Sequence, residues 1–123
     1  MAVVRYLVTD VDAAVAFYTN VLEFELLEQW GPPFAMVKCG DLTLWLSGPG
    51  SSASRPIGDG SRPVPGGWNR VVLETDKLDL LIERLTRAGV RFRSDVISGP
   101  GGRQIVVNDP SGNPIELFEA GAA

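Results

Sequence analysis

Residues 104–118, QIVVNDPSGNPIELF, decide the fold of this chain. An apolar run ends in Asp-Pro-Ser-Gly-Asn, a cluster of residue types that favour turns, and a second apolar run follows. The pattern predicts a β-hairpin, with one strand from Gln104 to Val107 and a returning strand from Pro114 to Phe118. Glu116 is expected in the returning strand of a 123-residue chain that contains no histidine.

The hairpin completes a βαβββ order in the second half of the chain. Trp68–Glu74 is strand-like, Asp76 is expected to cap a helix, and Gly89 is expected to end it. The helix is predicted from apolar residues at helical spacing, namely Leu78, Leu81, Ile82, Leu85 and Ala88. The three strands that follow are predicted over Val90–Ile97, Arg103–Asn108 and Pro114–Phe118.

The first half shows the same order of elements. A strand is predicted over Val3–Val8, and Thr9-Asp10 supplies the polar start of a helix. The apolar stripe of this helix consists of Val11, Ala14, Val15, Tyr18 and Leu22. The next three strands are predicted over Phe24–Trp30, Phe34–Cys39 and Leu42–Ser47. Because the halves match at an offset of about 67 residues, an internal duplication is the simplest explanation.

A single α+β domain over residues 1–123 is therefore expected. Neither half could bury both its helix stripe and its sheet face alone, so the two modules, 1–47 and 68–119, should pack side by side. The linker between them, 48–67, is rich in Gly, Ser and Pro. It is either a plain surface connection or a lid over a ligand.

Charge and composition exclude several classes of partner. Eleven Lys and Arg against fifteen Asp and Glu give a net charge of -4 without a run of like charges, so nucleic acid is not expected as a partner. No apolar stretch approaches the roughly 20 residues that span a bilayer, and the N-terminus lacks a signal-peptide arrangement. We expect no membrane partner and a cytoplasmic location. The single Cys39 cannot form an internal disulfide and is expected to be a packed thiol.

Three segments together carry a family resemblance. They are the helix opening Asp10–Tyr18, the helix exit Leu22–Phe24 and the turn and strand Asp109–Leu117. The sequences of these segments resemble those of the vicinal oxygen chelate superfamily, which comprises the glyoxalase, bleomycin-resistance and extradiol-dioxygenase proteins. The resemblance implies two tandem βαβββ modules that form a curled mixed sheet around a cleft. That family usually has glycine at the position of Glu23, where a glutamate at positive φ would cost about 1 kcal/mol. The alternative is a turn of different construction at this position.

The resemblance also bears on metal binding. In metal-using members the ligands project inward from the first and last strand of each module, and these positions fall here on Val3, Leu44, Arg70 and Glu116. Only Glu116 offers a metal donor, whereas a catalytic site needs about three protein ligands. No metal and no cofactor are therefore expected. Arg70 should instead form an ion pair with Glu116 inside the cleft, and either residue could contact a ligand.

Strand alternation extends these positions to a predicted cleft face. Its members are Val3, Arg5, Leu7, Leu42, Leu44, Leu46, Trp68, Arg70, Val72, Pro114, Glu116 and Phe118. Trp30 and Phe34 flank a Gly-Pro-Pro turn, where exposed rings could stack on a planar ligand. The predicted ligand-binding residues are Arg5, Leu7, Trp30, Phe34, Leu44, Leu46, Trp68, Arg70, Glu116 and Phe118. Trp30, Trp45 and Trp68 could each lie in the core or in a dimer contact instead.

The favoured hypothesis for such a cleft is a metal-independent protein that sequesters a hydrophobic or aromatic small molecule. The resemblance implies this function, because one branch of the family binds antibiotics in self-resistance. Members of that branch form homodimers with ligand clefts at the junction, and a homodimer is expected here. The acidic net charge would suit a cationic drug or tolerate a flat polycyclic one.

Two alternatives stay open. The first is a glyoxalase- or dioxygenase-like lyase or isomerase, either metal-free or with an atypical metal site, in which Arg70 could polarise a carbonyl and Glu116 could move a proton. No catalytic residue is nominated, because the cleft face offers no histidine and no carboxylate pair. The second is an interaction module whose cavity is filled by its own side chains.

Overall fold

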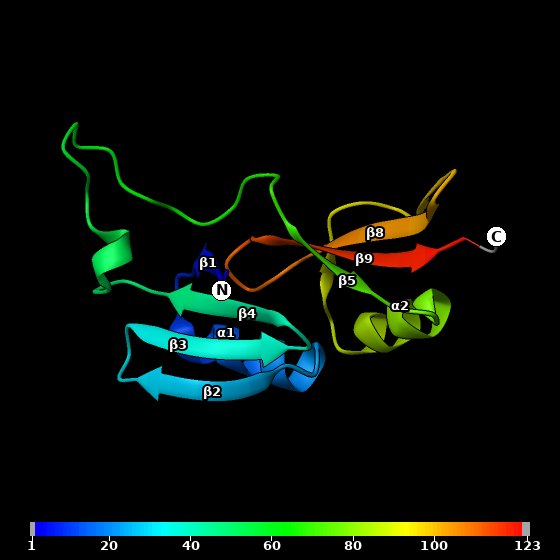
Figure 1. Cartoon of the computed structure of the whole chain (residues 1–123), viewed down its shortest axis with the longest axis horizontal. Helices are drawn as coiled ribbons and strands as arrows, with labels where there is room; N and C mark the ends of the chain where they lie inside the picture. The colour runs from blue at the N-terminus through cyan, green and yellow to red at the C-terminus, as the bar shows by residue number, and fades with distance from the viewer. Residues whose placement is uncertain (1, 122–123) are drawn as a thin grey trace. The chain divides into compact units, whose positions relative to one another are not determined.

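The computed structural model describes residues 2–121 and divides the chain into two compact units (Figure 1). The first unit comprises the residues up to Gly66 together with Pro110–Asn113. The second comprises Gly67–Asp109 together with the residues from Pro114 onward. Each unit has its own mixed sheet, which confirms the predicted α+β class; the first unit has the predicted βαβββ order, and the second has one strand more.

The sheet of the first unit has four strands in the order β1-β4-β3-β2. β1 pairs with β4 in parallel, and the other neighbours are antiparallel. The sequence predicts the bounds of β3 and β4 correctly, because turn residues limit both strands. The four strands are β1 (Val4–Leu7), β2 (Glu25–Trp30), β3 (Phe34–Cys39) and β4 (Leu42–Ser47).

A helix packs on one face of this sheet. It begins as α1 (Val11–Ala16), capped by the Asp10 carboxylate, which accepts a hydrogen bond from the Ala13 N–H at 3.1 Å. It continues as a π-helical turn, η1 (Phe17–Val21), and α1 contacts β3 and β4. The core between helix and sheet is built from Val11, Ala14, Tyr18, Tyr6, Ala35, Val37, Leu44 and Leu46, all buried.

The second unit repeats this arrangement. Its sheet has the order β5-β9-β8-β6, with β7 paired to β8 beside that path. α2 (Leu78–Arg87) contacts β9, and the buried core includes Leu78, Leu85, Val107, Ile115 and Leu117. The strands are β5 (Val71–Glu74), β6 (Arg91–Phe92), β7 (Ile97–Gly99), β8 (Gly102–Asn108) and β9 (Pro114–Ala120).

Strand pairing supports the predicted duplication in register. β1 is parallel to β4 with Val4 opposite Leu44, and β5 is parallel to β9 with Val71 opposite Ile115. Val71 stands at the predicted offset from Val4, so Ile115 corresponds to Leu44. The neighbouring residue Glu116 therefore corresponds to Trp45. Trp45 and Glu116 thus occupy equivalent positions on the sheets of the first and the second unit.

Two helix exits use left-handed backbone, of which the sequence predicts the one at Gly89 and leaves the one at Glu23 open. Gly89 ends α2 with φ of 75°, and Glu23 follows η1 with φ of 63°. Within residues 2–121, Glu23 is the only residue other than glycine with positive φ. A side chain at this position strains the backbone, because Cβ approaches the following carbonyl oxygen.

Two predictions about the second unit were wrong. Asp76 does not cap α2, because the helix begins after Lys77 and the Leu78 N–H is satisfied by Glu119 Oε2 of β9 at 2.9 Å. The predicted strand Val90–Ile97 is two short strands, β6 and β7, which pair with different stretches of β8. Residues 93–96 leave the ladder between them, and apolar alternation alone does not reveal such a break.

The turn between β8 and β9 is held by hydrogen bonds within the first unit. Asn113 donates from Nδ2 to the Leu7 carbonyl at 2.7 Å and accepts from the Gly66 N–H at 2.8 Å. Ser111 Oγ accepts a hydrogen bond from the Thr9 N–H at 2.8 Å. These bonds explain why the turn uses side chains that can accept and donate, beyond the turn preference of its residue types.

The segment after β4 has little regular structure. It contains one 3-10 turn, η2 (Ser52–Ser54), before β5 begins at Val71. Within residues 2–121, neither α1 nor α2 nor any other helix has the length and apolar character needed to cross a membrane.

Candidate functional site

The candidate site lies on the face of the first sheet opposite α1. β1 and β4 pair with Arg5 opposite Trp45, so these two side chains share a face. The prediction that Leu44 and Leu46 share the Arg5 face was wrong. Both are fully buried on the helix side, because alternation in the parallel pair places them with Tyr6.

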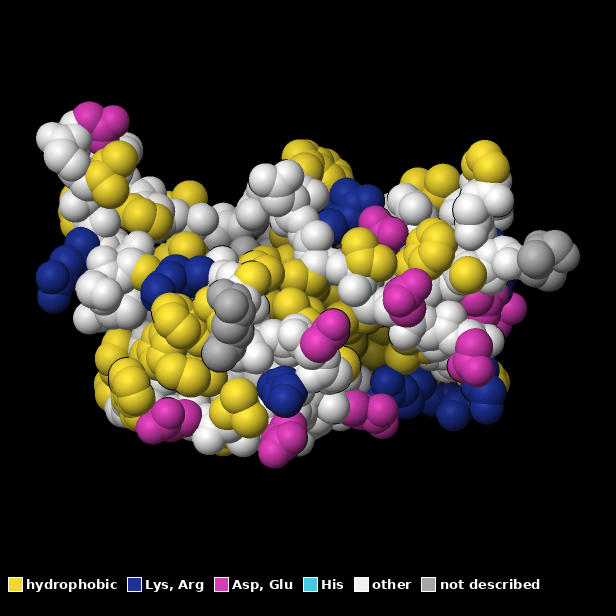
Figure 2. Space-filling model, in the orientation of Figure 1, with side chains coloured by type: hydrophobic (Ala, Val, Ile, Leu, Met, Phe, Trp, Pro, Cys, Tyr) yellow, Lys and Arg dark blue, Asp and Glu magenta, His cyan; other side chains and the backbone are white. Residues whose placement is uncertain are grey.

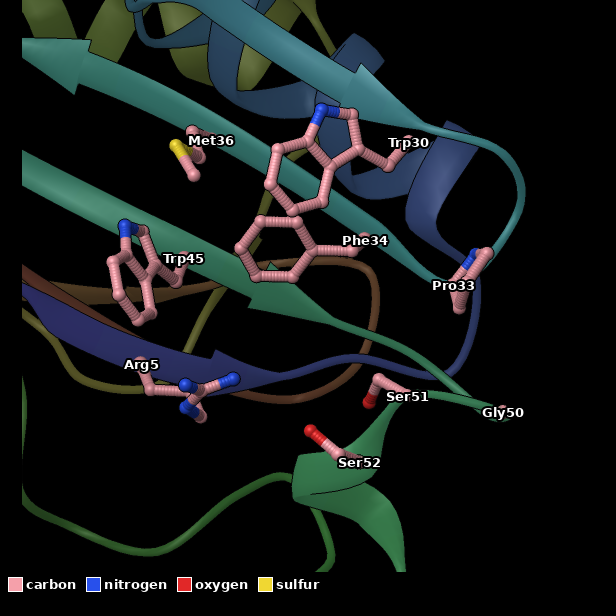
Figure 3. Close-up of a pocket in the computed structure, with 9 residues that line it drawn as sticks. All are labelled: Arg5, Trp30, Pro33, Phe34, Met36, Trp45, Gly50, Ser51 and Ser52. Carbon is pink, nitrogen blue, oxygen red and sulfur yellow. The ribbon is translucent and has the colours of Figure 1, made fainter.

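A cavity of about 430 Å³ opens on this face (Figure 3). Its volume falls within the roughly 300–1,000 Å³ range of small-molecule pockets. The lining brings together three predicted ligand residues, Arg5, Trp30 and Phe34. The remaining lining residues are Pro33, Met36, Trp45, Gly50, Ser51 and Ser52.

One wall of the cavity is a row of three aromatic rings. Phe34 lies between Trp30, with ring centroids 5.6 Å apart, and Trp45, with centroids 5.9 Å apart. The three rings project from neighbouring strands β2, β3 and β4 (Figure 3). Trp30 is 58% exposed, so a large apolar surface remains available to a ligand. The edge-to-face and tilted packing fixes the rings without covering them.

Arg5 supplies the only charged group of the lining. Its guanidinium carbon lies 5.0 Å from the centroid of the Trp45 ring, and Nη1 donates to Ser47 Oγ at 2.9 Å. The ring and the buried hydroxyl hold the guanidinium in place from two directions.

The rim of the cavity comes from the segment that follows β4. Gly48 donates its N–H to the Pro33 carbonyl at 2.9 Å, and Ser51 Oγ donates to the Gly48 carbonyl at 2.7 Å. A Cβ at Gly48 would lie 2.7 Å from Cγ2 of Val11, so only glycine permits this close approach. The approach positions Ser51 and Ser52 at the mouth of the cavity.

The second unit presents an ion pair on the corresponding face of its sheet. Arg70 donates from Nε and Nη2 to Glu116 Oε1, at 3.0 and 2.8 Å. Val72 and Val106 are the strand neighbours of Glu116 on this face, and Val72 is exposed. The sequence predicts this pair, and the structure confirms the contact.

The other predicted residues are not among those that line the cavity. Trp68 is 68% exposed, and the Arg93 guanidinium carbon stacks 4.6 Å from its ring centroid. Arg93 also donates to Asn108 Oδ1 at 2.9 Å. Phe118 shares the Glu116 face and is half-buried. Leu7 lines a separate cavity of about 230 Å³ in the first unit, beside Thr9 and Arg62.

The residues at the metal-ligand positions of the fold do not fit a metal ion. By strand register the four positions hold Val3, Trp45, Arg70 and Glu116, which provide one carboxylate, and Arg70 already binds it. Within residues 2–121 no group of three or more His, Cys, Asp and Glu side chains is placed to hold a metal ion.

Sequence reasoning missed part of the lining. Trp45 and Met36 were assigned to no ligand face, and Gly50, Ser51 and Ser52 lay in the linker. The pairing of β1 with β4 would have revealed Trp45, because Val4 opposite Leu44 places Arg5 opposite Trp45. No sequence signal identifies the linker residues, since their position depends on the tertiary approach at Gly48.

Known structures match this fold over nearly the whole chain. The antibiotic binding protein TnmS3 from Streptomyces sp. CB03234 is 29% identical with a TM-score of 0.71, covering 98% of this chain and 97% of that chain. A lactoylglutathione lyase from Agrobacterium tumefaciens is 25% identical with a TM-score of 0.73, covering 96% and 92%. TioX from Micromonospora sp. ML1, at 24% identity and a TM-score of 0.76, covers 96% of each chain and shows the shared fold.

Comparison at the level of sequence gives the family. The chain matches none of the curated proteins. The model of the Glyoxalase/Bleomycin resistance protein/Dioxygenase superfamily matches residues 1–117, which include Glu116 and every helix and strand except the end of β9. The chain therefore belongs to the glyoxalase/bleomycin resistance protein/dioxygenase superfamily.

Proposed function

We propose that this protein binds and sequesters a flat aromatic small molecule without a metal ion, in the manner of an antibiotic self-resistance protein. The observation that carries the proposal is the row of rings Trp30, Phe34 and Trp45 along a cavity of about 430 Å³. Exposed aromatic rings at fixed positions favour a planar partner, because stacking adds about 0.5–1.5 kcal/mol per ring pair beyond area burial.

The chemistry of the lining also favours binding over catalysis. The cavity contains one guanidinium, two serine hydroxyls and an apolar wall, without a carboxylate or a histidine. Such a lining can bind and orient a ligand but offers no general base of suitable pKa. The similarity to TnmS3, which is described as an antibiotic binding protein, supports the same function.

A homodimer is part of the proposal. The sheets carry exposed apolar side chains, such as Trp30 on β2 and Val72 on β5, and Trp68 before β5 is exposed as well. In Figure 2, apolar side chains are visible among the charged ones on the displayed face. We expect a second copy of the chain to complete the ligand cleft at the junction, with Trp68, Arg70, Glu116 and Phe118 contributing from the second unit. A cytoplasmic location is expected as well.

The test is a thermal-shift and tryptophan-fluorescence screen of chelator-treated protein. Planar compounds such as anthraquinones and phenazines should raise the melting temperature without added metal. A ligand at about 100 times its dissociation constant should add about 2.7 kcal/mol to the free energy of unfolding. Stabilisation by divalent metal alone, with none by the planar compounds, would contradict the proposal. Sedimentation of the purified protein would test the dimer.

A metal-free lyase or isomerase is a second candidate. The observation in its favour is that Arg70 uses only Oε1 of Glu116 for its two hydrogen bonds, which leaves the second carboxylate oxygen for a substrate proton. The similarity to a lactoylglutathione lyase also favours this second candidate. Turnover of an α-hydroxy thioester or a related carbonyl compound that is abolished by E116Q would establish this function in place of sequestration.

A further inference from the structure

We infer that the ligand of this cavity is a planar aromatic anion, and that Arg5 selects it by binding a carboxylate or enolate on its ring system. The inference rests on the proposed function and names the chemical class of the ligand. It assigns to Arg5 a role in specificity that the aromatic wall alone cannot supply, because stacking does not distinguish charge.

The local charge of the site is opposite to that of the whole protein. The chain carries a net charge of -4, yet the single charged side chain in the lining is that of Arg5. No lining residue bears a carboxylate that could accept a cationic ligand. The overall charge, which would suit a cationic drug, is therefore a poor guide to the ligand. Charged groups close to the ligand decide whether the site favours an anion or a cation, because charges farther than about 8 Å away are screened at physiological salt.

Arg5 is also free of a carboxylate partner within the described part of the chain. Arg70 and Arg103 each bind a glutamate, whereas Arg5 donates a hydrogen bond to the hydroxyl of Ser47. A guanidinium has five N–H donors, and the bond to Ser47 uses one of them. The others remain to bind a planar anion, for which the forked geometry of arginine is suited.

The cavity has a polar end and an aromatic wall. Figure 3 shows the guanidinium of Arg5 and the hydroxyls of Ser51 and Ser52 along one side, with the rings of Trp30 and Phe34 along the other. Trp45, in contact with both Arg5 and Phe34, joins the two. A ring system stacked on Phe34 would direct a substituent toward Arg5. The arrangement fits a fused-ring carboxylate or an ionised hydroxyquinone.

Three compounds with one ring system and different charges test the inference. They are anthraquinone-2-carboxylate, the neutral 2-methylanthraquinone and the cationic 2-(aminomethyl)anthraquinone. Calorimetric titration of the chelator-treated protein should give the carboxylate a dissociation constant at least about tenfold below that of the neutral compound, and the amine the weakest binding. The neutral compound tests the aromatic cavity itself.

Variants then assign the preference to Arg5. R5M should abolish the preference for the carboxylate over the neutral compound, and R5K should keep part of it. R87M is the matched control, since it removes the same charge from the exposed side of α2. A cooperative thermal unfolding transition shows that R5M is folded.

Each outcome has one meaning. Equal affinity of the wild type for the carboxylate and the neutral compound overturns the inference and leaves the proposed function standing. A preference that persists in R5M also overturns it. Failure of all three compounds to bind overturns both. A carboxylate preference that is lost in R5M and kept in R87M supports the inference.

Discussion

Arg70 donates two hydrogen bonds to a single carboxylate oxygen of Glu116, from Nε at 3.0 Å and from Nη2 at 2.8 Å. The arginine side chain is 25% exposed and the glutamate side chain 11% exposed, so the pair is largely withdrawn from water. In metal-using members of the superfamily this glutamate is a ligand. Here the carboxylate is bound by a permanent cation from Arg70, the residue that precedes β5.

Replacing Arg70 by methionine is expected to lower the free energy of unfolding by about 1–3 kcal/mol, because a nearly buried carboxylate would lose its partner. The double variant R70M/E116Q should recover much of the loss. Urea unfolding near neutral pH measures both. R87M breaks an exposed pair with Glu83 and should cost less than about 0.5 kcal/mol. Equal losses in R70M and R87M would contradict the importance of the buried pair.

The aromatic wall predicts a separate effect on binding. F34L should weaken the affinity for a planar ligand about tenfold, which corresponds to about 1.4 kcal/mol, because Phe34 contacts both neighbouring tryptophans and faces the cavity. Calorimetric titration measures the affinity. L27A is a suitable control, since Leu27 is exposed on β2 and lies outside the lining. A similar loss in both variants would argue against stacking in this cavity.

Much of the fold could be predicted because local signals agreed with one another. Turn residues limit β3 and β4, Asp10 marks the start of α1, and the hairpin that carries Glu116 is bounded by its Pro-Ser-Gly-Asn turn. The elements depend on neighbouring residues, which are visible in a single sequence. The Arg70–Glu116 pair was predicted from the family resemblance, which indicated the inward positions of the strands.

The face of β4 could not be predicted in the same way. Leu42, Leu44 and Leu46 look like the inward stripe, yet Trp45 between them lines the cavity. Alternation separates the two faces of this strand but does not reveal which face packs against the helix, so the tertiary arrangement decides. The cap of α2 shows the same limit, because Glu119 comes from β9, far along the chain.

Glu23 offers a test of backbone strain. Its φ of 63° is unfavourable for a residue with Cβ, so E23G should raise the free energy of unfolding by about 0.5–1 kcal/mol. This gain is the backbone strain that is relieved minus the stabilisation that is lost with the contacts of the Glu23 side chain. Thermal and urea unfolding measure it, and E25G, on the exposed strand β2, is expected to be destabilising instead. A loss of stability in E23G would show that the side-chain contacts outweigh the strain.

Glu119 predicts a pH dependence of stability. The Leu78 N–H bond and the Arg103 bond lower the pKa of Glu119 below its usual value of 4.5, with the backbone bond as the larger cause. A carboxylate whose pKa is lowered by folding stabilises the protein above its unfolded pKa, and this contribution is lost as the pH falls through the folded pKa. The difference in melting temperature between wild type and E119Q should therefore be largest near neutral pH.

Melting curves between about pH 7 and pH 3 measure this difference. It should decrease once the pH falls below about 4.5, the usual value for glutamate. A difference that stays constant over this range would mean that the charge of Glu119 does not stabilise the folded protein through its bond to the start of α2.

Gly48 connects the core of the first unit to the rim of the cavity. A Cβ at this position would lie 2.7 Å from Cγ2 of Val11, a core residue of α1, so G48A should cost about 1–3 kcal/mol through overpacking. It should also weaken ligand binding, because Ser51 and Ser52 follow the same backbone. G58A is the matched control: a Cβ at Gly58 meets nothing within 4 Å.

Adding V11A to G48A removes the obstructing methyl group and should restore ligand affinity, even though V11A leaves a cavity in the core. Calorimetric titration of the wild type, G48A, G48A/V11A and G58A measures ligand affinity. If G48A/V11A binds the ligand as weakly as G48A does, the close approach at Gly48 does not position the rim.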